Sequence, residues 1–151
     1  MHPEIAIVEV GPRPIAAVRL TTVLSKWPSQ VMQALDKVYE AVKAGKVRQS
    51  GQNVMVYHPR GDGRVDIECG VETAAEFERF GEVVYCETPA GMAVTTAHIG
   101  PYGQLRNSYD AIADWSCKNG HRLAETCWEI YGDWSDDPAA LRTDIFHLLR
   151  R

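Results

Sequence analysis

The sequence predicts an α+β fold built from two copies of a strand-helix-strand-strand module. Three observations predict it. Short segments rich in β-branched residues and bounded by glycine or proline are typical of strands. Two longer segments carry apolar residues at helical spacing. The same order of elements then occurs twice along the 151 residues.

The first half is expected to hold one helix among several strands. Its strands are predicted at residues 5–10, 15–22, 53–58 and 65–71. Pro28 suits the first turn of the helix. One apolar stripe at helical spacing follows, formed by Val31, Leu35, Val38 and Val42. Gly45 suits the position just after the helix end.

The second half repeats this order after a charged connector at residues 72–81. Its strands are predicted at residues 82–86, 92–99, 126–131 and 143–149. Gly100-Pro101 opens the helix, and its apolar face holds Leu105, Tyr109 and Ile112, with Trp115 at the rim of that stripe. Asn119-Gly120 ends it.

The spacing of matching residues indicates an internal duplication. Pro28 lies 29 positions before Tyr57, and Pro101 lies 30 positions before Tyr131. In this alignment Met55 matches Glu129, and Asp66-Ile67 matches Asp144-Ile145.

We interpret residues 1–151 as a single domain with half-modules at about 1–75 and 80–151. Two such halves related by a pseudo-twofold would form an antiparallel sheet with both helices on one face. A small-molecule groove is expected where the halves meet.

Composition restricts the partners. The net charge of −4 argues against direct binding to nucleic acid or to an anionic membrane surface. No apolar run approaches the roughly 20 residues of a membrane helix. The N-terminus has no basic region typical of a signal peptide, so we expect a cytoplasmic protein.

No metal or cofactor is expected. The four cysteines (Cys69, Cys86, Cys117 and Cys127) form no C-x-x-C pair, and the histidines follow no metal-binding pattern. A glycine-rich phosphate loop and a Ser-His-Asp arrangement are also not visible.

Glu129 is the most informative residue, because it places a carboxylate inside an apolar, aromatic strand. Side chains alternate faces along a strand, so Glu129 and Tyr131 are expected on one face, with Trp128 and Ile130 on the other. Burying an unpaired charge is costly. We therefore predict that Glu129 lies in a ligand pocket; the alternative is a surface glutamate at a sheet edge.

The stretch from His98 to Trp115 has a G-P-Y helix opening and a late tryptophan, and Gly120 and the E-x-Y strand of Glu129 and Tyr131 follow. This pattern resembles the GyrI-like small-molecule-binding domain, also called the bacterial transcription-activator effector-binding domain. The resemblance implies two strand-helix-strand-strand modules with a central groove, and a glutamate, here Glu129, that reaches into the pocket. Ala124 and Glu125 stand where many relatives have a second small residue.

Seven further residues are candidate ligand contacts. Tyr131 shares the face of Glu129, and Tyr57 and Met55 would be its counterparts in the first half. The others are Tyr102, Trp27, Trp115 and Phe146. For each, the alternative is an ordinary place in the core or at its rim.

The resemblance implies three functions. Relatives attached to AraC-type or MerR-type DNA-binding regions sense drugs, so the first is a stand-alone protein that binds amphipathic aromatic, and in some cases cationic, compounds. No helix-turn-helix precedes the first strand, so a regulatory output would need a protein partner. The second is a hydrolase of cyclopropanoid genotoxins, with Glu129 activating water and a tyrosine such as Tyr131 or Tyr102 donating to the oxyanion. The third is a DNA gyrase inhibitor.

Overall fold

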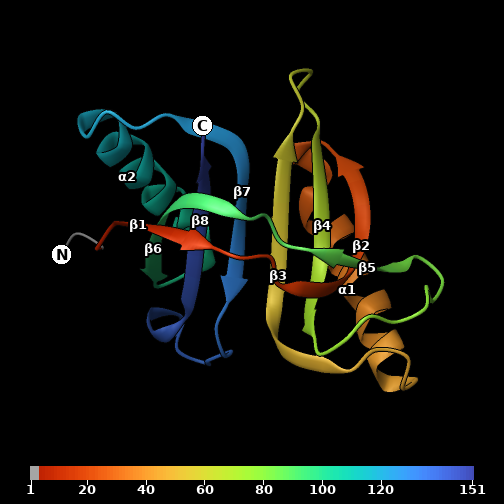
Figure 1. Ribbon diagram of the computed structural model, residues 1–151. Coiled ribbons are helices and arrows are strands. Elements are labelled where there is room, and N and C mark those ends of the chain that lie inside the picture. The colour runs from red at the N-terminus through yellow and green to blue at the C-terminus, as the bar shows by residue number, and fades with distance from the viewer. Residues whose placement is uncertain (1–3) are drawn as a thin grey trace. The chain divides into compact units, whose positions relative to one another are not determined.

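The computed structural model describes residues 4–151 and resolves the chain into two compact units (Figure 1). The N-terminal unit is Pro12–Thr88. The C-terminal unit combines residues 4–11 with Pro89–Arg151.

The N-terminal unit is an antiparallel four-stranded sheet with one helix. Its elements are β2 (Pro14–Thr22), α1 (Trp27–Lys43), β3 (Gln49–Pro59), β4 (Val65–Thr73) and β5 (Val83–Glu87). The strand order is β3-β4-β2-β5. One face of α1 is buried, through Val31, Ala34, Val38 and Ala41.

The C-terminal unit has the same plan. Its elements are β1 (Ala6–Val10), β6 (Gly91–Ile99), α2 (Leu105–Lys118), β7 (Leu123–Tyr131) and β8 (Arg142–Leu149). The strand order is β1-β6-β8-β7, again antiparallel. In its core Val94, Ile112 and Ile145 pack together, so α2 covers one face of the sheet.

The predicted α+β fold and its duplicated modules are confirmed. In each unit a strand precedes the helix and two strands follow it, and the strand orders are equivalent. The half-modules predicted at about 1–75 and 80–151 differ from the units, because the edge strands are exchanged. β1 pairs with β6, in register from Ala6↔Thr95 to Val10↔Gly91, and β5 pairs with β2.

One of the sequence matches that suggested the duplication is out of register. Met55 pairs with Cys69, whereas its match Glu129 pairs with Ile145. Cys69, not Ile67, is therefore the counterpart of Ile145, and the Asp66-Ile67 match is displaced by two residues.

Both helices end where the sequence predicted, whereas the start of α2 and the buried face of α1 differ in detail from the prediction. Gly45 and Gly120 follow α1 and α2 with φ of 74° each, the left-handed conformation that glycine adopts readily. A 3₁₀ turn at Tyr102–Gln104 separates Gly100-Pro101 from α2. In α1 the fully buried positions include Ala34 and Ala41, while Leu35 and Val42 lie half-buried beside them. Within residues 4–151, no helix has the length and apolar character needed to cross a membrane.

Candidate functional site

Glu129 lies on β7 with its side chain buried; only 4% of the residue is exposed. It pairs with Ile145, which packs under α2, so Glu129 is on the helix-covered face of its sheet. Trp128 lies on the other face, where its ring stacks on Phe146 with centroids 5.3 Å apart. The predicted alternation along this strand is therefore correct.

Two tyrosines donate hydrogen bonds to the Glu129 carboxylate. The Tyr131 hydroxyl, two residues along the same strand, donates to Oε1. The Tyr109 hydroxyl on α2 donates to Oε2 over 2.6 Å. Hydrogen bonds to a carboxylate are stronger than those between neutral groups. They offset part of the cost of holding this charge away from water.

Tyr102 extends this tyrosine cluster toward the surface. Its ring meets that of Tyr131 edge to face, with centroids 5.5 Å apart and planes at 84°. Tyr102 is 38% exposed, whereas Tyr131 is partly buried. Within one unit, the rings of Tyr102 and Tyr131 therefore connect the protein surface to the Glu129 carboxylate by direct contacts.

Buried His98 anchors the turn that presents Tyr102. Its Nε2 donates to the carbonyl of Pro101 over 3.0 Å. In the neutral ring Nδ1 then accepts a hydrogen bond from the Ser108 hydroxyl, 2.7 Å away. His98 therefore ties the Gly100-Pro101-Tyr102 turn to α2.

Two further polar side chains lie on the same face. Thr143 pairs with Tyr131, is fully buried, and its hydroxyl has no hydrogen-bond partner in the described part of the chain. Cys127 lies two residues before Glu129. Burial raises the pKa of the Cys127 thiol to about 11; a hydrogen bond with the Tyr109 hydroxyl opposes this rise, and the Glu129 charge adds to it.

The first-half candidates form a separate cluster inside the N-terminal unit. Trp27, at the start of α1, stacks on Tyr57 with centroids 6.5 Å apart and planes at 22°. The Tyr57 hydroxyl donates to Met55 Sδ over 3.3 Å, and Met55 is 6% exposed. The structure thus brings these three together, and their contact with a ligand stays a prediction.

A hollow of about 370 Å³ occurs on the N-terminal unit, and none of the predicted site residues lines it, although two of its lining residues, His58 and Ile67, adjoin Tyr57. It is lined by Arg19, Leu20, Thr21, His58, Asp66, Ile67 and Glu68. Glu68 pairs with Arg19 at 3.3 Å and with His58 at 2.9 Å.

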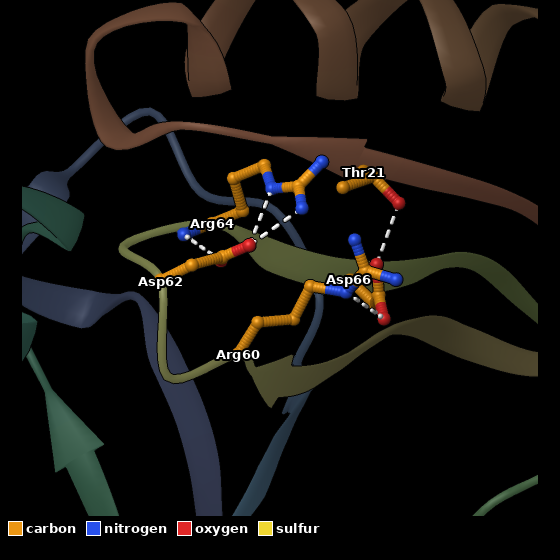
Figure 2. Close-up of polar contacts among 5 residues, drawn as sticks. All are labelled: Thr21, Arg60, Asp62, Arg64 and Asp66. Carbon is orange, nitrogen blue, oxygen red and sulfur yellow. Dashed lines mark hydrogen bonds and ion pairs between the residues drawn. The ribbon is translucent and has the colours of Figure 1, made fainter.

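The polar contacts next to this hollow continue into the β3–β4 hairpin, as Figure 2 shows. Asp66 accepts a hydrogen bond from Thr21 and pairs with Arg60 at 3.2 Å, and Asp62 pairs with Arg64. The carboxylates here already have cationic partners, and no three potential metal ligands converge among residues 4–151. We therefore interpret the hollow as an ion-paired sheet surface.

The GyrI-like small-molecule-binding domain model matches residues 3–150. The chain belongs to this family. The resemblance inferred from the G-P-Y and E-x-Y motifs is therefore confirmed. No curated protein sequence matches the chain.

Solved GyrI-like structures share its fold. The C-terminal domain of EcmrR aligns with a TM-score of 0.82 and 22% identity, covering 100% of this chain and 99% of that one. In the EcmrR–DNA complex the chain spans 58% of the regulator. SAV2435 bound to tetraphenylphosphonium aligns with a TM-score of 0.71 and 11% identity, and the alignment covers 97% of this chain and 94% of that one. A hydrolase from Listeria innocua encoded by lin2189 aligns with a TM-score of 0.61 and 13% identity, and the alignment covers 97% of this chain and 92% of that one.

Two predicted ligand contacts, Phe146 and Trp115, have aromatic partners outside the tyrosine cluster. Phe146 is on the opposite face of the sheet from Glu129, stacked on Trp128, and its contact with a ligand stays a prediction. Trp115 stacks on His121 with centroids 5.7 Å apart and packs against the core of the GyrI-like C-terminal unit. The contact of Trp115 with a ligand stays a prediction.

Sequence reasoning missed Tyr109 and His98 as members of this site. Tyr109 was assigned to the apolar stripe of its helix, where it does pack. A buried tyrosine still needs a partner for its hydroxyl, and that requirement was the available signal. His98 lay inside the family motif, but nothing in the sequence showed that its ring would hold Pro101.

The four thiols should differ strongly in reactivity. Cys117 is exposed on α2, whereas burial raises the pKa of Cys69 to about 12 and that of Cys86 to about 11. Because the thiolate is the nucleophile, we expect one thiol to react rapidly with a disulfide reagent at neutral pH, and Cys117→Ser to remove that phase. A rapid phase that persists in Cys117→Ser would contradict this assignment.

Proposed function

We propose that this protein binds amphipathic aromatic cations at Glu129 and thereby senses or sequesters them. The observation that carries the proposal is a nearly fully buried carboxylate that accepts hydrogen bonds from Tyr109 and Tyr131, with the ring of Tyr102 against that of Tyr131. Aromatic faces attract cations, and an acid away from water attracts them more strongly than one in solvent. The tyrosines would contact the aromatic groups while Glu129 supplies the opposing charge.

A structural neighbour supports this ligand class. SAV2435, which shares the fold, has been solved with tetraphenylphosphonium bound. That compound combines a delocalised cation with four aromatic rings. It is therefore a suitable first probe for this chain.

Calorimetry with tetraphenylphosphonium tests the proposal. We expect wild-type protein to bind it and Glu129→Gln to bind it about 10- to 100-fold more weakly, because one buried charge is removed at nearly constant shape. For triphenylphosphine oxide, which is neutral, Glu129→Gln should reduce the affinity much less.

Glu125→Gln is the matched control. It removes a carboxylate from the same strand, but one whose side chain is 72% exposed and lies 4.0 Å from Arg150. Its affinity should equal that of the wild type. Equal binding of the cation by wild type and Glu129→Gln would contradict the role of Glu129.

A hydrolase of cyclopropanoid electrophiles is the second candidate function. It is favoured by the two phenolic hydroxyls that hold Glu129, because a fixed carboxylate can activate water. Their single O–H hydrogens are used on Glu129, so the hydroxyl of Tyr102, whose ring contacts Tyr131, would donate to the developing oxyanion. Substrate loss followed by absorbance tests it. Turnover is expected in wild type and not in Glu129→Gln; turnover that survives the substitution would exclude this mechanism.

A further inference from the structure

Among the described residues of the C-terminal unit, Trp134 is the most exposed large apolar side chain, with 73% of its surface accessible. It lies in the segment between β7 and β8, in the sequence Gly132-Asp133-Trp134-Ser135-Asp136-Asp137. Tryptophan side chains are highly buried on average, so an indole with most of its surface in solvent is uncommon.

Backbone hydrogen bonds place this segment at the same end of the sheet as the Tyr102 turn. Gly132 N–H donates to the carbonyl of Arg142 over 2.8 Å. Gly100 N–H donates to the carbonyl of the preceding residue, Leu141, also over 2.8 Å. The segment that carries Trp134 and the turn that carries Tyr102 are therefore attached to adjacent residues at the start of β8.

The short chain distance keeps Trp134 close to Tyr131. Three residues span at most about 11 Å between Cα atoms. Beyond Trp134 the segment is held locally, because Ser135 Oγ accepts the Asp137 N–H and Asp137 Oδ1 accepts the Ala139 N–H. The indole is thus presented from a hydrogen-bonded turn at the end of the sheet where Tyr131 and the Tyr102 turn also lie.

The charges around Trp134 suit a cation. The segment contains Asp136 and Asp137 and no basic residue. The nearest cation along the chain, Arg142, pairs with Asp144 at 3.0 Å. An indole face is the best aromatic partner for a cation, and surrounding carboxylates add to that attraction.

We propose that Trp134 is the outer binding residue of the site, covering the exposed side of an aromatic cation whose charge faces Glu129, and that it sets the preference for ligands with several aryl groups. This rests on the proposed binding function. The ligand would lie between the indole and the Tyr102–Tyr131 pair.

Binding of tetraphenylphosphonium by Trp134 variants tests the inference. We expect Trp134→Ala to weaken binding about five- to thirtyfold, and Trp134→Phe to stay within about threefold of wild type because an aromatic face remains. Met92→Ala is the matched control: Met92 is 47% exposed on the same unit but lies at the opposite end of β6. It should bind as the wild type does.

Tryptophan fluorescence gives a second readout. The difference between wild type and Trp134→Phe isolates the emission of Trp134, since Trp27, Trp115 and Trp128 are common to both proteins. Covering the indole predicts a blue shift of this difference spectrum and lower acrylamide quenching when tetraphenylphosphonium is added.

The outcomes separate this inference from the function on which it rests. Weaker binding by both Trp134→Ala and Glu129→Gln supports both. Wild-type affinity in Trp134→Ala, with a loss in Glu129→Gln, overturns the role of Trp134 and leaves the binding function standing. No binding by wild-type protein overturns both.

Discussion

Replacement of Gly70 by alanine is expected to destabilise the N-terminal unit by about 3 kcal/mol or more. A Cβ atom at Gly70 would lie 1.8 Å from the carbonyl oxygen of Ala16 and 2.7 Å from the Cα of Ala17. Both contacts are with the backbone of β2, so no side-chain rotation relieves them. β2 and β4 are neighbouring strands in the interior of this unit's sheet, and to accommodate the methyl group they would have to separate.

Urea unfolding measures this effect as a lower transition midpoint. Gly61→Ala is the matched control, because its Cβ meets nothing within 4 Å and its φ is not in the left-handed region. That variant should stay within about 0.5 kcal/mol of wild type. A Gly70→Ala protein as stable as Gly61→Ala would show that the two strands are not held this closely.

The sequence predicted the face of Glu129 but not that of its neighbours on the next strand. Alternation within a strand is local, so Glu129 and Tyr131, two residues apart, could be placed on one face from the sequence alone. The face of Phe146 depends on how β8 is registered against β7, and a one-residue shift reverses it. The connecting segment is long and irregular, so its length could not fix that register.

The exchange of β1 and β5 between the units could not be predicted from the sequence either. Each edge strand pairs with a segment that is distant in sequence, and strand propensity contains no information about its partner. By contrast, the helix ends at Gly45 and Gly120 were predictable because left-handed backbone conformation is a local property of glycine.

The prediction that connects fold and site concerns Tyr109. Tyr109→Phe should destabilise the protein by about 1.5–3 kcal/mol, because it removes a donor from a carboxylate that is 4% exposed. Tyr39→Phe is the matched control. Its hydroxyl also extends from a helix to a strand, but it donates to the neutral amide of Asn53, so we expect a cost of only about 0.5–1.5 kcal/mol.

A double-mutant cycle with Glu129→Gln isolates the charge-dependent part of this interaction. In the Glu129→Gln background the acceptor is neutral, and Tyr109→Phe should then cost about as much as Tyr39→Phe does in the wild type. Chemical unfolding of the four proteins of the cycle gives the coupling energy. If the cost of Tyr109→Phe is the same with glutamate and glutamine at position 129, the charge of Glu129 adds nothing to its hydrogen bond with Tyr109. The stabilisation of the Glu129 charge would then come from its other contacts, among them the hydrogen bond from Tyr131.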